Sequence, residues 1–393
     1  MESELKALNP QSNDRHPASD RDDGPLLTAE AKNPEPQCEA SPSSPSLEEM
    51  EKKYAAYVRN DVYGTMGLGE LPWAEKFLLG VALVFLLPIR VAAGTTVLLI
   101  YYVICRVCTA FLSPSRVEEQ EDYAHMVGWR RAVIVQTGRF LSRVMLFIFG
   151  FYWIGESRRA DGELNHEMVS GDQSEEQERP GVVISNHVSY LDILYHMSAS
   201  FPSFVAKRSV AKLPLIGLIS KCLGCVYVQR ELKSPNFKGV SGVVNDRIRE
   251  AHQNKLAPKM LLFPEGTTTN GDYLLPFKTG AFLAKVPVLP FILRYPYQRF
   301  SPAWDSISGV RHVILLLCQF VNYMEVIRLP VYYPSEQEKE DPKLYADNVR
   351  KLMAREGNLI LSDIGLAEKR IYHAALNGNI SMPPPTLLHE KDD

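Results

Sequence analysis

The sequence lacks the features that mark several common protein classes. Its 393 residues carry a formal net charge of −3, so there is no overall positive charge for nucleic acid. The first residues are polar and acidic, so no secretory signal peptide is expected. No internal repeat is present. The length allows two to three domains of ordinary size, and these absences argue against a nucleic-acid-binding, secreted or repeat protein.

Cysteine is also scarce, with six in the chain. Two C-x-x-C pairs, Cys105/Cys108 and Cys222/Cys225, each resemble half of a zinc site. More than a hundred residues separate the two pairs, and no histidine flanks them. We therefore expect no metal, and reduced, partly buried thiols on the cytosolic side of a membrane.

Three segments are too polar to contribute to a folded core. Residues 1–48 are rich in Pro, Ser, Asp and Glu and are expected to be disordered, because they cannot bury enough apolar surface to offset the entropy of ordering them. Residues 157–179 are polar and acidic without periodicity, which predicts an exposed insertion. Residues 377–393 are expected to form a flexible tail.

Residues 49–156 contain the apolar segments that predict a helical membrane anchor. The core of this region, 77–112, is apolar except for Arg90 and Arg106. It fits a helical hairpin that turns at Pro88–Arg90 within one leaflet, or a single span from Val91 to Leu112 after an interfacial helix. A pair of buried helices in a soluble protein is the third possibility. The second apolar run, 144–155, is too short to span and predicts a membrane-lying or core helix.

From residue 180 to 376, strand and helix patterns alternate, which predicts an α/β layered domain with a mixed central sheet. The expected strands are 182–185, 203–206, 225–228, 260–263, 288–293, 313–317 and 326–332. The expected helices are 189–199, 215–222, 240–252 and 342–356. Because functional loops gather at strand ends in such domains, candidate site residues are sought there.

The first candidate is the stretch Asn186–Asp192, which follows the apolar run 182–184. His187 and Asp192 are five positions apart, which on a regular helix would place them about 140° apart. They can converge only if His187 lies in a strand-to-helix turn and Asp192 one turn into the helix. A carboxylate that fixes the tautomer of a histidine makes a general base. The alternative is a helix-capping Asn beside a surface His.

Three further stretches follow. Gly224–Arg230 is a strand that ends in Arg230, which could bind a phosphate bidentately or form a surface salt bridge. Phe263–Thr267 contains Glu265, Gly266 and Thr267, which suit a polyol or glycerol phosphate, or an ordinary turn. Val286–Pro290 could line an apolar groove or form an edge strand. A basic cluster, which fits a polyanion or a solvated helix face, comprises Lys207, Arg208, Lys212 and Lys221.

In this order and at these intervals, the four stretches resemble the glycerolipid acyltransferase family, whose blocks are N-H-x4-D, G-x-x-(Y/F)-x-x-R, F-P-E-G-T and V-P-V-x-P. The wider chain looks like the plant lysophospholipid acyltransferases, above all those acting on lysophosphatidylethanolamine. Many family members carry an acidic residue where this chain has Gln229. Relatives with calcium-binding extensions have acidic EF-hand loops, which this chain lacks, so no calcium is expected.

The resemblance implies an acyl-CoA-dependent O-acyltransferase without a cofactor, acyl-CoA being a co-substrate. It implies His187 as the base and Asp192 as its orienter, with Arg230, Glu265, Gly266, Thr267 and Gly224 at the acceptor and Lys207 and Arg208 at the phosphates of coenzyme A. The acceptor is expected to be lysophosphatidylethanolamine, and also lysophosphatidylcholine, in the endoplasmic reticulum membrane, with the site facing the cytosol. The alternatives are a lysophosphatidic acid or glycerol-3-phosphate acceptor, a metal-dependent hydrolase, and a membrane scaffold without activity.

Overall fold

The computed structural model describes residues 47–117, 120–159, 179–228 and 239–378. The disordered tail expected at 1–48 and the flexible tail expected at 377–393 lie almost entirely outside these described residues, as does most of the insertion expected at 157–179. The first two residues of that insertion are described and belong to a strand, β3 (Ile154–Arg158). The domain boundaries at these segments stay predictions.

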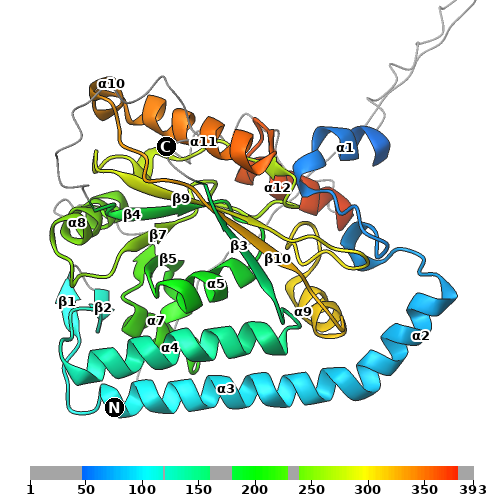
Figure 1. Cartoon of the computed structure of the whole chain (residues 1–393). Helices are drawn as coiled ribbons and strands as arrows, with labels where there is room; N and C mark the ends of the chain where they lie inside the picture. Colours follow the sequence, from blue (N-terminus) through cyan, green and yellow to red (C-terminus); the bar gives the residue numbers. More distant parts are fainter. Residues whose placement is uncertain (1–46, 118–119, 160–178, 229–238, 379–393) are drawn as a thin grey trace, which may run out of the picture. The chain divides into compact units, whose positions relative to one another are not determined.

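A seven-stranded sheet forms the centre of the acyltransferase-like region, in the order β3-β10-β9-β4-β7-β5-β6 (Figure 1). Its other strands are β4 (Val182–Ser185), β5 (Ser203–Lys207), β6 (Val226–Val228), β7 (Met260–Leu262), β9 (Val288–Arg294) and β10 (Met324–Arg328). The strands from β9 to β6 are mutually parallel, whereas β10 is antiparallel to β9 and parallel to β3. The sheet is therefore mixed, as expected, and the carboxyl ends of five parallel strands meet at one edge.

The described residues also form two small sheets, which pair β1 (Ser115–Val117) with β2 (Gln120–Asp122), and β8 (Tyr273–Leu274) with β11 (Ile360–Leu361). Helices cover both faces of the central sheet. The helices are α1 (Leu47–Lys53), α2 (Trp73–Val81), α3 (Leu87–Cys108), α4 (Trp129–Ile148), α5 (Leu191–Ala199), α6 (Arg208–Ala211), α7 (Ile216–Leu223), α8 (Gly239–Gln253), α9 (Gly309–Leu317), α10 (Glu336–Glu340), α11 (Pro342–Gly357) and α12 (Leu366–Leu376). Short turns of helix are η1 (Ala55–Tyr57), η2 (Thr65–Gly67), η3 (Ala82–Leu86) and η5 (Thr279–Ala281).

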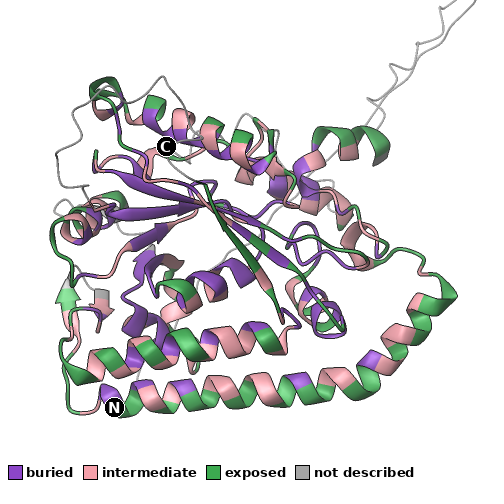
Figure 2. Ribbon diagram, in the orientation of Figure 1, coloured by how far each residue is buried: buried purple, intermediate pink, exposed green. Residues whose placement is uncertain are grey.

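The core divides into layers because successive side chains of a strand point to opposite faces. In β4, Val182 and Ile184 pack on the side of α8 and α11, whereas Val183 packs on the side of α3, α5 and α7. All four residues of β4 are buried, as a parallel strand covered on both faces requires. Figure 2 shows the same pattern, with the central strands buried between helices whose outer faces are exposed.

One expected strand is wrong. The run 313–317 is not a strand but the second half of α9, Gly309–Leu317. A short run of Val, Ile and Leu has no periodicity that separates a strand from a buried helix. In the structure His312 and Leu315–Leu317 face the core while Val310 is exposed, which is a helical pattern. Several described elements were not expected, among them β3 and α12.

The apolar region 77–112 contains no hairpin. The elements α2, η3 and α3 form one continuous helix, Trp73–Cys108, which is long and apolar enough to cross a membrane by length and composition. It bends where η3 widens into a π-helical turn (Figure 1), directly before Pro88. A proline removes one backbone donor and crowds the preceding turn, so a widened turn there lets the helix continue. The turn expected at Pro88–Arg90 is therefore wrong.

Helix α3 packs lengthwise on the domain. At one end, the buried Arg90 donates hydrogen bonds to the carbonyl oxygens of Leu317 and Phe320 and to the hydroxyl of Tyr152. At the other end, Tyr101 and Cys105 lie in the core cluster that also contains side chains of α4, α5 and α7. Helix α4 runs beside α3 (Figure 1). Only one side of α3 is therefore left without a protein partner among the described residues.

Folding brings the two C-x-x-C pairs together despite their separation in sequence. Cys105, Cys108, Cys222 and Cys225 are buried in the same apolar cluster between α3 and α7, and the thiols of Cys105 and Cys222 interact. Within the described ranges, no group of three or more His, Cys, Asp or Glu side chains could hold a metal ion. The absence of a metal stays an expectation.

Candidate active site

His187 lies at the carboxyl end of β4, in the turn that leads to α5. Strand β4 ends at Ser185 and α5 begins at Leu191, which is the placement that convergence of His187 and Asp192 requires. Between them, Asn186 is buried and its side chain bonds both backbone groups of Leu293, accepting from N–H at 2.8 Å and donating to C=O at 2.9 Å. The side chain of Asn186 thereby makes the two hydrogen bonds that backbone groups of a strand would make between β4 and β9. It is neither a helix cap nor part of the pair itself.

The side chains of His187 and Asp192 form a hydrogen-bonded pair. The distance from His187 Nδ1 to Asp192 Oδ2 is 2.9 Å. The same Oδ2 atom accepts the backbone N–H groups of Val188 at 2.8 Å and Ser189 at 3.0 Å. A carboxylate that accepts from Nδ1 requires the proton on that nitrogen, which leaves Nε2 as the basic atom. Among the described residues, none hydrogen-bonds to Nε2.

Burial differs sharply within the pair. Asp192 is completely buried, while the side chain of His187 keeps 20% of its surface exposed. The imidazole ring stacks on Phe263 with 4.1 Å between ring centroids and 16° between planes. The carboxylate is thus held away from water and the imidazole reaches the surface. In this arrangement the carboxylate fixes the orientation of the ring and leaves Nε2 accessible.

Glu265 connects the histidine turn to the loop after β7. Its Oε1 accepts the backbone N–H of His187 at 2.7 Å, and its Oε2 accepts that of Leu275 at 2.9 Å. The side chain is only 3% exposed, and burial raises its pKa to about 8 although both hydrogen bonds act in the opposite direction. Its two oxygens therefore already cross-link two loops of the site. A direct contact of Glu265 with the acceptor stays a prediction.

Gly266 and Thr267 complete this turn. Gly266 has φ +71°, a left-handed conformation that favours glycine, and a side chain there would meet Cε of Lys278 at 3.2 Å. Lys278 is exposed and follows the same loop, with its N–H bonded to the carbonyl of Pro264. Thr267 is buried. The turn thus lies beside His187, as the sequence predicts, and the side chain of Lys278 lies next to Gly266.

The remaining predicted site residues separate into three groups. Lys207 ends β5 and Arg208 begins α6, so both lie at the same edge of the sheet as His187. Gly224 precedes β6 and therefore lies at the opposite edge, because β4 and β6 run in the same direction. Its φ of +74° ends helix α7, which is a structural reason for a glycine there and corrects its assignment to the acceptor. Arg230 and Gln229 lie outside the described residues.

The basic cluster expected near the site is smaller in the structure. Lys221 lies on α7 and forms an ion pair with Glu121 of β2, with 2.8 Å between Nζ and Oε2. Lys207 and Lys212 are exposed at either end of α6. Lys221 is therefore engaged elsewhere, whereas Lys207 and Lys212 remain at the carboxyl edge on either side of α6.

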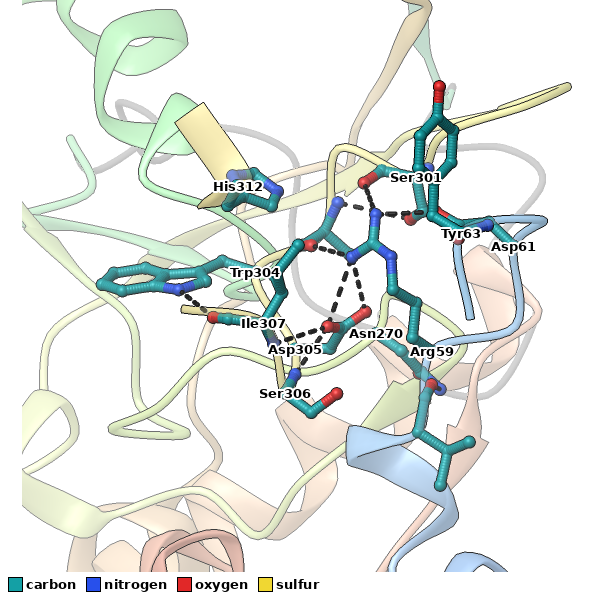
Figure 3. A network of polar contacts seen from close by, with 12 residues as sticks. Arg59, Asp61, Tyr63, Asn270, Ser301, Trp304, Asp305, Ser306, Ile307 and His312 are labelled. Carbon is teal, nitrogen blue, oxygen red and sulfur yellow. Dashed lines mark hydrogen bonds and ion pairs between the residues drawn. The ribbon is translucent and has the colours of Figure 1, made fainter. Parts of the chain in front are cut away.

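A buried polar network supports the histidine turn from behind, and no sequence motif announced it. The carbonyls of His187 and Val188 accept the N–H groups of Thr269 and Trp304 at 3.0 and 2.8 Å. Figure 3 shows the guanidinium of Arg59 between Ser301 and Asp305; it donates to the carbonyl of Ser301 at 2.6 Å and to Asp305 Oδ2 at 3.0 Å. Both side chains of this ion pair are buried.

Both ends of the described chain contribute to this network. Arg59 also pairs with Asp61 at 2.6 Å, and the side-chain amide of Asn270 donates to the carbonyl of Val58 at 3.0 Å. From α12, the ammonium of Lys369 donates to the carbonyl and hydroxyl oxygens of Thr268, both at 2.7 Å. The loop that holds His187 is thus fixed by residues from the beginning and the end of the described chain.

Comparison with known proteins identifies the family of this chain. A family model described as acyltransferase matches residues 167–294. The lysophospholipid acyltransferase LPEAT1 of Arabidopsis thaliana is 62% identical over 413 aligned positions, which cover 100% of both chains. The chain belongs to the family of lysophospholipid acyltransferases. The resemblance stated from the four sequence blocks is thereby confirmed.

More distant members of the lysophospholipid acyltransferase family are longer than this chain. The lysophosphatidylcholine acyltransferase of Drosophila melanogaster is 34% identical over 66% of this chain and 45% of its own length. Lysophosphatidylcholine acyltransferase 2 of Homo sapiens is 31% identical over 82% of this chain and 54% of its own. The chain therefore spans about half the length of these two relatives, and all of LPEAT1.

Within this family member, the buried carboxyl of Glu265 is expected to make stability depend on pH. Its pKa is raised from an ordinary 4.5 to about 8, so the folded chain holds this proton where the unfolded chain has lost it. The resulting stabilisation is complete below pH 4.5 and is lost as the pH rises to 8. Glu265→Gln has no such proton, so the melting temperature of the wild type should fall relative to that of the variant as the pH rises through this interval.

The measurement is a pair of thermal unfolding curves at each pH. The control is Glu336→Gln, which changes an exposed carboxylate whose only partner among the described residues is Lys339. A difference between wild type and Glu265→Gln that stays constant from pH 4.5 to 8 would contradict the expectation.

Proposed function

We propose that this acyltransferase moves the acyl group of an acyl-CoA to the free glycerol hydroxyl of a lysophospholipid, preferring lysophosphatidylethanolamine and also using lysophosphatidylcholine. The observation that carries the proposal is the His187–Asp192 pair, with a buried carboxylate on Nδ1 and an accessible Nε2. The acceptor class is supported by the identity of 62% over the full length of LPEAT1. No cofactor is needed, since acyl-CoA is itself a substrate.

In the proposed reaction, Nε2 of His187 takes the proton of the acceptor hydroxyl as its oxygen attacks the thioester carbon. A carbon–oxygen bond forms, and the tetrahedral intermediate then breaks its carbon–sulfur bond. Coenzyme A leaves as a thiolate, to which the imidazolium can return the proton. Asp192 stabilises that imidazolium and, through Nδ1, holds the ring in one tautomer. No covalent acyl-enzyme and no metal ion take part.

The substrates are assigned to residues on both sides of the pair. Lys207 and Arg208 would bind phosphates of coenzyme A, and Arg230, Gly266 and Thr267 would bind the phosphate and glycerol of the acceptor. Glu265 acts in this proposal mainly by holding the backbone of His187, since its oxygens accept two backbone N–H groups.

We place the enzyme on the endoplasmic reticulum membrane with the pair facing the cytosol. The support is the continuous apolar helix Trp73–Cys108, whose outer side chains are exposed. The most exposed large apolar side chains of this helix are Trp73, Phe77, Val84, Phe85, Ile89, Val103 and Val107. An apolar surface of this length would be covered by lipid, and the acceptor stays in the same leaflet.

A panel of acceptors tests the proposed function. The purified wild-type enzyme receives radiolabelled acyl-CoA with lysophosphatidylethanolamine, lysophosphatidylcholine, lysophosphatidic acid or glycerol-3-phosphate. We expect the first to give the highest kcat/KM and the second to be used as well. Equal or better use of lysophosphatidic acid or glycerol-3-phosphate would contradict the proposed acceptor. Transfer to none of the four would contradict the proposed reaction.

A further inference from the structure

Tyr295 reaches the proposed catalytic pair from β9, the strand that pairs with β4 in the central sheet. It directly follows β9, and its hydroxyl donates a hydrogen bond to Asp192 Oδ1 at 2.5 Å, although 103 residues separate the two in sequence. The side chain is 7% exposed. Its ring lies edge-on to Phe151 with 5.9 Å between centroids. The phenol is therefore held in one orientation by packing.

The hydrogen bonds of Asp192 are distributed unequally between its two oxygens. Oδ2 accepts from His187 Nδ1 and from the backbone N–H groups of Val188 and Ser189. Among the described residues, Oδ1 accepts from Tyr295 alone. A fully buried carboxylate oxygen without a donor is strongly disfavoured, so the phenol supplies the hydrogen bond that Oδ1 would otherwise lack among the described residues.

Resting on the proposed function, we propose that Tyr295 is a positioning residue for the general base. By binding Oδ1, it aims Oδ2 at His187 and withdraws part of the negative charge that the imidazole senses. Tyr295 thereby sets how strongly Asp192 favours the protonated imidazole. It touches neither substrate in this scheme and acts through Asp192.

The phenol can serve as a donor throughout the working range of the enzyme. Burial and the neighbouring charge of Asp192 both raise the pKa of Tyr295 well above 10. A phenol that stays protonated cannot add a second negative charge beside Asp192. Its contribution to the pair is therefore constant with pH, and only the imidazole responds.

Other titratable groups face the pair and must be separated from this effect. Glu265 contacts His187 from the loop after β7, and its pKa of about 8 places its titration near neutrality. On α5, burial lowers the pKa of His196 to about 4, so this side chain is neutral at working pH. Tyr190 is buried and its pKa is raised by burial. Because these groups are unchanged by a substitution at Tyr295, the test compares profiles between variants.

The test is the pH dependence of kcat for Tyr295→Phe. Without the phenol, Asp192 presents more charge to His187 and favours the imidazolium, so the loss of activity on the acid side should move about 0.5–1 pH unit higher. We also expect kcat to fall about 10-fold or more, since a hydrogen bond to a buried charge is lost. A lower melting temperature alone would not move the acid limb.

Tyr190→Phe is the matched control, because it removes the same hydroxyl from a buried tyrosine nearby. The hydroxyl of Tyr190 bonds His312 Nδ1 at 3.2 Å and not Asp192. We expect its acid limb to coincide with that of the wild type. In an Asp192→Asn background, Tyr295→Phe should cause no further movement of the limb.

A second variant keeps the proposal testable if Tyr295→Phe fails to fold. Genetic replacement of Tyr295 by 3-fluorotyrosine retains the hydroxyl but makes it a stronger donor, so the acid limb should move to lower pH, opposite to the phenylalanine variant. Coinciding profiles for the wild type and both Tyr295 variants would overturn the proposal, as would an equal shift in Tyr190→Phe. Near-normal turnover of His187→Ala would instead overturn the proposed function, whatever the Tyr295 variants do.

Discussion

His187→Ala is expected to lower kcat for acyl transfer by about 10²–10⁴-fold, the usual contribution of a general base. The imidazole is partly exposed, and among the described residues its side chain hydrogen-bonds to Asp192 alone, so its loss should leave the fold intact. The measurement is turnover of radiolabelled acyl-CoA with lysophosphatidylethanolamine, together with the membrane-bound fraction and the melting temperature of the variant. Both of the latter should match the wild type.

The control for this substitution is His125→Ala. His125 is also partly exposed, and it lies beside Glu250 and Arg247, remote in sequence from the β4–α5 turn. Its removal should change kcat less than twofold, in line with an ordinary surface position. Near-normal turnover in His187→Ala, or an equal loss in both variants, would show that His187 is not the base.

Asp192→Asn is expected to produce a loss of similar size, about 10²–10⁴-fold in kcat. The amide can keep the local geometry, with its oxygen accepting from the donors now on Oδ2 and its NH2 donating to the hydroxyl of Tyr295. What disappears is the negative charge that stabilises the imidazolium. The substitution therefore separates the electrostatic role of Asp192 from its structural role.

The double variant sharpens this second prediction. If His187 and Asp192 act as one unit, the double variant His187→Ala/Asp192→Asn should be no slower than His187→Ala alone, since residues that act together are not additive. A multiplicative loss in the double variant would show two independent contributions. Activity of Asp192→Asn within a few-fold of the wild type would remove Asp192 from the mechanism.

Local patterns in the sequence account for the placement of the pair. The strand predicted at 182–185 and the helix predicted at 189–199 place a turn after Ser185. In the structure α5 begins at Leu191, and the turn between it and β4 lets His187 and Asp192 meet. The alternation of strands and helices likewise predicts the central sheet. Where the local signal was ambiguous, as in the apolar run of α9, the prediction was wrong.

The rest of the site depends on contacts that no local pattern contains. Three side chains reach the site region from distant segments, namely Tyr295, Arg59 and Lys369. The residues next to each of them in the sequence form no motif that would predict this. Their roles follow from strand order and loop packing, which only the folded chain determines. The error at Gly224 has the same origin, because strand direction decides which end of β6 faces the pair.

The course of the helix in the apolar region 77–112 could not be predicted from the sequence alone. Composition identified residues 77–112 as apolar, but a proline after a short apolar run fits both a turn and a continuing helix. In the structure the helix continues through a π-helical turn at Ala82–Leu86. The buried Arg90 interrupts the apolar sequence of this segment. It donates to the carbonyl of the last residue of α9 and to that of Phe320, and thereby attaches the helix to the domain.

The joint packing of the first and last described segments has a consequence for biosynthesis. The hydroxyl of Tyr57 binds the carbonyl of Gly365 across 308 positions, and α12 carries the ammonium that holds Thr268. During translation the loop behind His187 can therefore reach its final structure only after α12 has left the ribosome. Such a late, long-range closure is slow and keeps the nascent chain without a formed site. The enzyme should therefore gain activity only after α12 has been synthesised, when the apolar helix Trp73–Cys108 has long since emerged.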